Sequence, residues 1–386
     1  MKPVLPSATR VIHAGKAPRT FAKTVGPPIL RGSTILLPDA ASLYDDDQIT
    51  YGRQGLSTQA TLSEALAELE GATDVRLYSS GLAALTSAML AVLKTGDEVL
   101  VVDSIYKPTR RFCNRTLKRF GITARYYAPR SAPEAVLAMA GPATRLIVME
   151  SPGSLTFEVQ DAPTIATLAK AQGILTLMDN TWAAGLLFQP LAHGIDMSAQ
   201  SLTKYVGGHS DVFMGSVAAA DLAIVSALDH DILDFGWSVS PDDAYQMLRG
   251  LRTLPTRMAR HAASALQVAT WLEAQPQIAR VHYPALSSSP DHDLWRRYFS
   301  GAAGVFSIEL RPHPAEAVDR CLNHLRHFGL GFSWGGFESL ALSCDEQLAQ
   351  RTTPPSLKGP LLRLNIGLED PADLIDDLAQ ALRTLP

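Results

Sequence analysis

The sequence is poor in the features that mark several protein classes. Its three cysteines, Cys113, Cys321 and Cys344, lie far apart and form no Cys-x-x-Cys pair, which favours reduced, buried thiols over a disulfide scaffold. No cluster of histidine and cysteine has the spacing of metal ligands. A net charge of −4 over 386 residues predicts no basic surface for a nucleic acid. We therefore expect neither a metal centre nor a nucleic-acid partner.

Long apolar runs and glycine-rich dinucleotide motifs are also missing. No run reaches the about 18 apolar residues that a membrane span requires, and the first residues lack the apolar core of a signal peptide. We expect a cytoplasmic protein without a membrane segment. No Gly-x-Gly-x-x-Gly follows an early strand, which argues against a nicotinamide-dependent dehydrogenase.

The segments that are present alternate between strand-like and helix-like patterns. This alternation, in a chain with 46% hydrophobic residues, predicts an α/β fold with a mostly parallel sheet. The expected strands of this sheet are 75–78, 98–103, 124–127, 145–150, 174–179, 197–201 and 212–219.

Further strands at 304–310 and 361–366, with helices at about 315–325 and 371–384, predict a smaller α/β unit. An amphipathic helix from Pro255 to about Trp271 is expected to bridge the two units. The predicted division is a large domain over 61–255 and a small C-terminal domain over 256–386.

Residues 1–60 carry prolines and glycines but few periodic apolar positions. This pattern predicts an extended arm. Because such an arm cannot bury itself, we expect it to lie on a neighbouring subunit.

Lys204 lies between the hydroxyl residues Ser201 and Thr203 and the pair Gly207–Gly208. The preceding segment is strand-like, and paired glycines indicate a tight turn. An amine held at a strand end among hydroxyls is arranged to form a Schiff base beside a phosphate site. The alternative is an exposed lysine in a loop.

Asp179 ends the apolar segment that precedes the Lys204 strand. Ligands bind outside the carboxyl ends of parallel strands, so Asp179 and Lys204 should approach one ligand. A carboxylate there can pair with a protonated pyridine nitrogen. The alternative role for Asp179 is a helix cap.

An anion site is predicted where a strand, a turn of small residues and a helix follow each other at Ser79–Leu82. Free amides and the helix dipole both favour phosphate. We expect Ser80 and the amides of Gly81 and Leu82 to bind it, although many strand-to-helix turns share this pattern.

Arg363 lies in the apolar strand 361–366, on the same face as Asn365. A buried arginine needs an anionic partner. The α-carboxylate of a substrate would match its planar fork. The alternative is a structural ion pair with Glu338 or Glu369.

Seven motifs in one order resemble those of the Cys/Met-metabolism family of enzymes that depend on pyridoxal 5'-phosphate (PLP). The family includes cystathionine β-lyases, cystathionine γ-synthases and methionine γ-lyases. The motifs are Tyr51–Arg53, Ser79–Leu82, Glu150–Ser154, Asp179–Gly185, Asp196–His209, Ser333–Gly336 and Arg363–Asp370.

The resemblance implies a type I PLP-dependent transferase fold with PLP held at Lys204. It implies that Tyr106 lies flat against the pyridine ring, and that Tyr51 and Arg53 hold the phosphate of the cofactor on the adjacent chain. From the residues alone, Tyr106 could equally cap the sheet, and Tyr51 and Arg53 could pack a loop. A homotetramer built from dimers with shared active sites would follow.

The resemblance also implies that Ser333 and Trp334 help Arg363 to bind the substrate. Within the family the motifs look most like those of bacterial cystathionine β-lyases. The implied activity is β-elimination of L-cystathionine, with Lys204 removing the α-proton and either Tyr106 or Lys204 protonating the sulfur.

Three positions depart from the β-lyase pattern, namely Gln54, Arg111 and Phe332. They should border the distal end of the substrate, so γ-lyase, γ-synthase and methionine γ-lyase activities stay open as alternatives. A regulatory protein without activity is disfavoured, because Lys204, Asp179 and Arg363 are all present.

Overall fold

The structure is a computed structural model, which describes residues 6–14, 24–45 and 48–386. Its larger sheet has seven strands in the order β1-β7-β6-β5-β4-β2-β3. The strands are β1 (Asp74–Tyr78), β2 (Glu98–Val102), β3 (Thr123–Tyr127), β4 (Thr144–Glu150), β5 (Leu175–Asp179), β6 (Met197–Ser201) and β7 (Gly215–Ala219). The prediction of a mostly parallel sheet is confirmed, although β7 begins later than expected.

The strands that carry the expected site residues are parallel neighbours. β3, β2, β4, β5 and β6 run parallel, and only the pairs β6–β7 and β7–β1 are antiparallel. Glu150 at the end of β4 is in register with Asp179 at the end of β5, and Asp179 is in register with Ala199 in β6. The carboxyl ends of three central strands therefore meet at one edge of the sheet.

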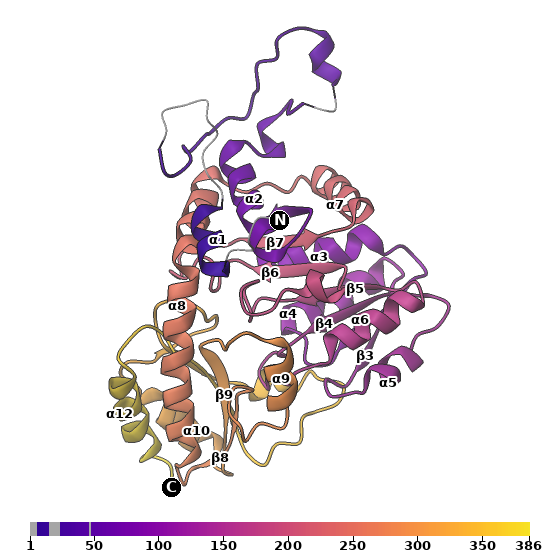
Figure 1. Cartoon of the computed structure of the whole chain (residues 1–386). Coiled ribbons are helices and arrows are strands. Elements are labelled where there is room, and N and C mark those ends of the chain that lie inside the picture. The colour runs from indigo at the N-terminus through magenta and orange to yellow at the C-terminus, as the bar shows by residue number, and fades with distance from the viewer. Residues whose placement is uncertain (1–5, 15–23, 46–47) are drawn as a thin grey trace.

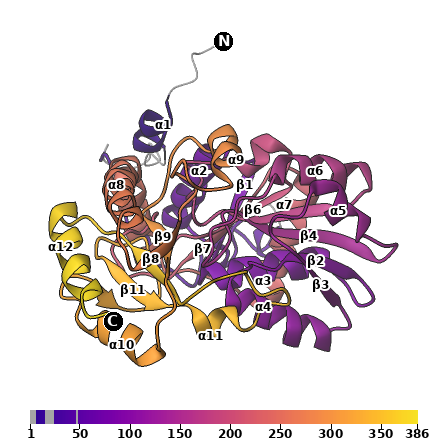
Figure 2. The same ribbon diagram turned by 90° about the horizontal axis from the view of Figure 1, so that it is seen from below.

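Helices cover both faces of this sheet. Figure 2 shows α5 and α6 on one side of the strands and α3 and α4 on the other. The interior is apolar, as in a parallel sheet that is buried on both faces. The elements around this sheet are α2 (Ser57–Glu70), α3 (Gly81–Val92), α4 (Lys107–Phe112), η3 (Cys113–Leu117), α5 (Pro133–Ala138), α6 (Ala162–Ala171), η4 (Pro190–His193) and α7 (Leu222–Phe235).

One long helix, α8 (Pro241–Glu273), runs past both sheets (Figure 1). The expected helix over residues 255–271 is present, but its predicted start is wrong, because the helix begins at Pro241 and continues through Pro255. Proline removes one backbone hydrogen bond. Leu251 and Leu254 before Pro255, and Met258 after it, are nevertheless buried in the same core. This tertiary packing outweighs the loss of one backbone hydrogen bond.

The second sheet has five strands in the order β10-β11-β12-β9-β8, and all its pairs are antiparallel except β10–β11. Its position beside α8 and α12 gives the smaller α/β unit that the sequence predicts (Figure 1). Its elements are β8 (Ile278–His282), α9 (His292–Tyr298), β9 (Val305–Leu310), α10 (Ala315–Asn323), β10 (Gly329–Leu330), β11 (Leu340–Ser343), α11 (Asp345–Leu348), β12 (Leu361–Asn365) and α12 (Pro371–Leu382).

The N-terminal segment is extended only in part. A short helix, α1 (Ser7–His13), buries Val11 in the main core, which the scarce apolar periodicity did not indicate. Residues 24–45 and 48–56 hold only the short turns η1 (Ala41–Tyr44) and η2 (Gly52–Gln54) and extend away from the body (Figure 1). The parts of the arm at 1–5, 15–23 and 46–47 lie outside the described residues.

Candidate active site

Lys204 lies in the turn that follows β6. Its Nζ donates a hydrogen bond to Ser333 Oγ at 2.6 Å. Ser333 belongs to the part of the chain that forms the smaller sheet. Gly208 closes the turn with a φ of +70°, and a Cβ at this position would lie 2.2 Å from Arg257 Nη1. The turn therefore requires glycine at 208.

The amine of Lys204 is tuned toward its neutral form. Burial and, to a lesser degree, the nearby Arg363 lower the pKa of Lys204 to about 8, against the opposing effect of Asp179. An ordinary exposed lysine would stay fully protonated at this pH. Lys204 is only partly exposed and its amine is hydrogen-bonded to Ser333, so it is not the freely exposed loop lysine of the alternative interpretation.

Asp179 faces the same space from the end of β5. Its Oδ1 accepts hydrogen bonds from Thr181 N at 3.0 Å and from Thr181 Oγ1 at 2.5 Å, which is an Asx turn. Residues 181–186 form turns rather than a helix, so Asp179 is not a helix cap. Burial raises the pKa of Asp179, while Thr181 and the Lys204 ammonium lower it.

Thr181 is a site residue that the sequence reasoning missed. Its hydroxyl also accepts the amide of Ser201 at 2.9 Å. One side chain thus joins the ends of β5 and β6. The Asp-x-Thr pattern directly after an apolar strand was the available signal.

The predicted anion site is formed at the start of α3. Ser80 caps this helix, because its Oγ accepts the Ala83 amide at 3.1 Å and its carbonyl accepts the Ala84 amide at 3.0 Å. The Gly81 and Leu82 amides are the first of the helix and have no acceptor within it. They are therefore available to an anion.

The end of β6 presses closely on this helix start. A Cβ on Gly81 would lie 2.4 Å from Ser201 Cβ, so only glycine fits there. The Ser201 hydroxyl thereby lies beside the helix amides. The hydroxyl of Thr203 is already used, since it donates to Met214 O at 3.2 Å and accepts from Met214 N at 3.0 Å. These groups fit a phosphate, with Ser201 better placed than Thr203 to bind it.

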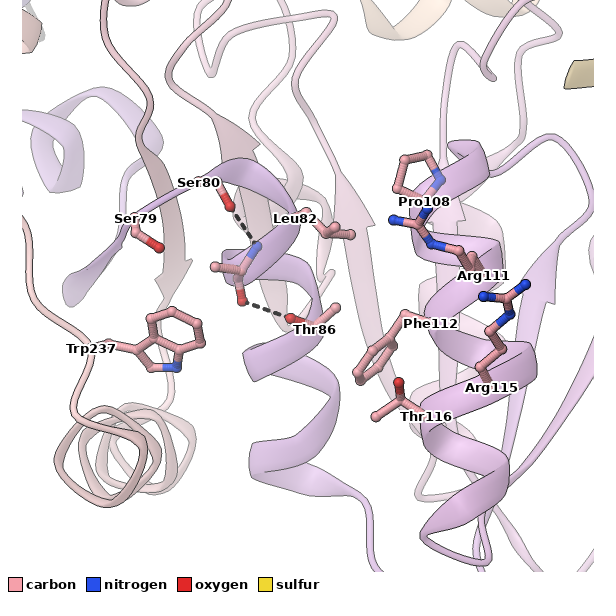
Figure 3. Close-up of a pocket in the computed structure, with 11 residues that line it drawn as sticks. Ser79, Ser80, Leu82, Thr86, Pro108, Arg111, Phe112, Arg115, Thr116 and Trp237 are labelled. Carbon is pink, nitrogen blue, oxygen red and sulfur yellow. Dashed lines mark hydrogen bonds between the residues drawn. The ribbon is translucent and has the colours of Figure 1, made fainter.

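A hollow of about 390 Å³ opens beside this turn, between α3 and α4 (Figure 3). Two arginines and no acidic residue line it, so it favours an anion. Its lining consists of Ser79, Ser80, Leu82, Ala83, Thr86, Pro108, Arg111, Phe112, Arg115, Thr116 and Trp237.

Arg363 is a buried cation without an acidic partner among the described residues. Its Nη2 donates to Ser333 O at 2.7 Å, and burial lowers its pKa. The alternative ion pair with Glu338 or Glu369 is not formed among the described residues; Glu338 accepts a hydrogen bond from Ser210, and Glu369 accepts one from Ser339. The guanidinium is thus free to bind an incoming carboxylate.

Ser333 connects the two cationic side chains. Its carbonyl accepts from Arg363, its hydroxyl accepts from Lys204, and its φ of +86° is rare for a residue other than glycine. Such strain concentrates at functional sites. The next residue, Trp334, places its ring centroid 5.7 Å from Lys204 Nζ, within range of a cation–π contact.

Tyr106 lies just before α4 and faces this group of side chains. Burial raises the pKa of its phenol, Arg363 lowers it, and Asp179 and Glu150 raise it further. The phenol therefore stays protonated at neutral pH. Its amide donates to Glu150 Oε2 at 2.7 Å.

The structure does not bring Tyr51 and Arg53 to the other predicted residues. Within the described chain, Arg53 Nη1 donates to Leu233 O at 3.2 Å, Tyr51 is 48% exposed, and no hydrogen bond or ion pair joins either residue to Lys204 or Ser80.

Two absences hold for the part of the chain that the structure describes. No group of three His, Cys, Asp or Glu side chains is placed to hold a metal ion. No helix there is both long enough and apolar enough to span a membrane.

A partly neutral lysine, a buried carboxylate, a helix-start anion site and an unpaired buried arginine meet at the carboxyl edge of a parallel sheet. The fold and this set of groups define an α/β enzyme that processes amino acids with a phosphorylated aldehyde cofactor. The chain belongs to the family of Cys/Met metabolism PLP-dependent enzymes, whose model matches residues 8–383.

Individual relatives cover almost the whole chain. The cystathionine beta-lyase of Bordetella avium is 42% identical over 97% of this chain and 96% of its own. The L-alanine/L-glutamate racemase of Wolbachia pipientis is 39% identical over the same shares. The crystal structure of metB from Corynebacterium glutamicum has 31% identity and a TM-score of 0.91, with 98% of each chain covered.

Proposed function

We propose that this protein is a PLP-dependent C–S lyase that converts L-cystathionine and water into homocysteine, pyruvate and ammonia. The observation that carries the proposal is the unpaired guanidinium of Arg363, which shares Ser333 with the amine of Lys204. An amino-acid carboxylate on Arg363 would place its α-carbon beside that amine. The β-lyase name of the Bordetella relative supports the choice of substrate.

The cofactor would be held by groups described above. Lys204 would bind its aldehyde carbon, Asp179 its protonated ring nitrogen, and Ser201 with the Gly81 and Leu82 amides its phosphate. When bound, PLP stabilises the negative charge that develops when a Cα–H bond is broken.

The side chains of this chain divide the remaining work. Arg363 fixes the α-carboxylate and so orients the Cα–H bond. Lys204, with its pKa lowered to about 8, accepts the α-proton as a general base. The Cβ–S bond then breaks and the sulfur leaves with its electron pair. The three-carbon enamine takes up water to give pyruvate and ammonia.

The leaving thiolate needs a proton, and two donors are within the site. Tyr106 holds a phenolic proton at neutral pH because burial raises its pKa. Lys204 holds the proton that it removed from the substrate. We assign protonation of the leaving thiolate to Tyr106, since its proton is available before the C–H bond breaks.

Product analysis tests the proposal. The PLP-loaded protein is mixed with L-cystathionine, and both the keto acid and the released amino acid are identified. Pyruvate with homocysteine is the expected result. 2-Oxobutyrate with cysteine would assign a γ-lyase instead, and no turnover would contradict the proposal.

The racemase relative supplies a second candidate activity. To test it, the protein is incubated with L-alanine and L-glutamate in deuterated water, and the D-isomers that form are measured. The proposal predicts that turnover of L-cystathionine to pyruvate exceeds formation of either D-isomer.

We further propose a homotetramer of dimers in which each arm completes the neighbouring site through Tyr51 and Arg53. Exposed apolar side chains in the arm support a partner surface, among them Val25, Leu36 and Tyr44. Sedimentation analysis would give the number of chains.

The two separate sheets support the division into an arm (1–60), a PLP-binding domain (61–255) and a small domain (256–386). A cytoplasmic role in methionine biosynthesis belongs to the same proposal.

A further inference from the structure

Glu150 is a buried carboxyl group that the mechanism above does not use. It ends β4 in register with Asp179 at the end of β5, so the two residues lie on strands about 4.8 Å apart. Both are at least nine-tenths buried. Two carboxylates so close together cannot both be charged without a large cost, and one proton is expected on the pair.

Hydrogen bonds favour the charged form of Asp179. Its Oδ1 accepts a hydrogen bond from the Thr181 amide at 3.0 Å and another from the Thr181 hydroxyl at 2.5 Å. That hydroxyl already accepts the Ser201 amide at 2.9 Å, so its own proton is directed at Asp179. Both partners of Oδ1 thus act as donors, which stabilises a carboxylate.

Hydrogen bonds allow the neutral form of Glu150. Its Oε2 accepts the Tyr106 amide at 2.7 Å, and its Oε1 contacts the Ser154 hydroxyl. Within the described chain that hydroxyl has no second hydrogen bond, so it can accept a proton from Glu150 as well as donate one. Glu150 can therefore carry a proton and keep both contacts.

The surroundings of Glu150 agree with this assignment. Burial and the nearby Asp179 raise the pKa of Glu150 well above its usual value, against weaker opposition from Ser154, the Tyr106 amide and Arg351. The cation Arg351 is itself paired with Glu158 and donates to Ser154 O at 2.7 Å. Asp179, Tyr106 and Arg351 are the titratable or charged groups that face Glu150.

We propose that Glu150 is a positioning residue that carries the proton of the Glu150–Asp179 pair and fixes Tyr106 and Ser154 at the site. In this role it leaves Asp179 as the negative group opposite Lys204. The inference rests on the proposed PLP-dependent function and adds a residue to it.

Two substitutions of Glu150 test its protonation state and its hydrogen bonds separately. Glu150→Gln is neutral, keeps an acceptor for the Tyr106 amide and offers an N–H donor to Ser154. Glu150→Ala removes both contacts. Two properties of the PLP-loaded protein are measured without substrate: the pH at which the visible absorption band changes, and the visible circular dichroism of the cofactor. Turnover is measured separately.

The proposal predicts that Glu150→Gln keeps the wild-type pH midpoint and keeps kcat/KM within about threefold. Glu150→Ala is expected to weaken the visible circular dichroism and to lower kcat/KM about 10²-fold through loss of positioning. Glu70→Gln is the matched control. It neutralises another buried carboxyl group, at the end of α2, and should leave both spectral properties unchanged.

Two results would overturn the proposal. A shift of the midpoint by about one pH unit or more in Glu150→Gln would mean that the native residue is charged. Wild-type spectra and rates in Glu150→Ala would remove the positioning role. If Glu150→Ala does not fold, Glu150→Asp replaces it, because its shorter acid cannot reach both partners; wild-type behaviour there also overturns the role. Because the spectra need no cystathionine, an unexpected reaction product leaves this test intact.

Discussion

Removal of the Arg363 side chain should weaken the binding of amino-acid substrates far more than it disturbs the cofactor. Arg363 is buried, donates only to Ser333 O, and has no carboxylate partner among the described residues. Truncation of one member of a buried charged pair costs about 2–5 kcal/mol. At about 1.36 kcal/mol for each factor of ten, kcat/KM of Arg363→Ala should fall roughly 30- to 5000-fold.

The loss should appear mainly in KM, because the α-carboxylate is bound equally before and during the reaction. Steady-state kinetics with L-cystathionine give both constants, and the visible absorption band reports whether the cofactor is retained. Arg363→Lys keeps the charge but not the planar fork, so it should recover only part of the affinity.

A pair of inhibitors separates recognition from general damage. L-2-Aminobutyrate carries the α-carboxylate but has no β-sulfur that could leave, and 1-propylamine lacks the carboxylate. Arg363→Ala should weaken the inhibition constant of the first compound and leave that of the second unchanged. Glu338→Gln is the control for a structural ion pair and should leave both constants unchanged. Equal losses for the two inhibitors, or losses in Glu338→Gln that match those in Arg363→Ala, would refute the assignment.

Three further predictions concern the amine, the core and the arm. Capture of PLP by the cofactor-free protein requires neutral Lys204, so its rate should rise with pH around the amine pKa of about 8; a rate independent of pH there would contradict this. Burial raises the pKa of Glu70 from 4.5 to about 7. The folded state thus binds a proton that the unfolded state releases above its own pKa. The free energy of unfolding should therefore fall by roughly 3 kcal/mol as pH rises from the unfolded to the folded pKa, and denaturant titrations of Glu70→Gln should lack this fall. Finally, Arg53→Ala and Lys204→Ala should each lack activity. Co-expression of the two variant chains should restore part of it, because a mixed dimer forms one site with Arg53 from one chain and Lys204 from the other. A mixed dimer without activity would contradict the shared site.

The sequence was sufficient for the seven strands of the larger sheet and for the residues that end them, but it did not predict β8, β10 and β11 of the smaller sheet. Asp179 ends an apolar run of strand length, Ser201 ends a short segment of mostly apolar or small residues, and parallel order brings such ends together. The Ser80–Leu82 turn was predictable because small residues precede an apolar helix. Arg363 was identified because a cation is unusual in an apolar strand.

Contacts between distant segments could not be predicted in this way. The link between Ser333 and Lys204 joins residues 129 positions apart, and no local pattern indicates it. Pro255 predicts a helix boundary, but burial on both sides keeps α8 continuous. Glu150 stood in a recognised motif without a role, because its neighbour Asp179 is adjacent only in the folded sheet.

The central claim is that Lys204 is the residue that holds PLP. Reduction of the PLP-loaded protein with borohydride, followed by protease digestion and mass spectrometry, locates the modified lysine directly. We expect a single pyridoxyl group on the peptide that contains Lys204. Modification of another lysine, such as Lys107 next to Tyr106, or of none, would contradict it.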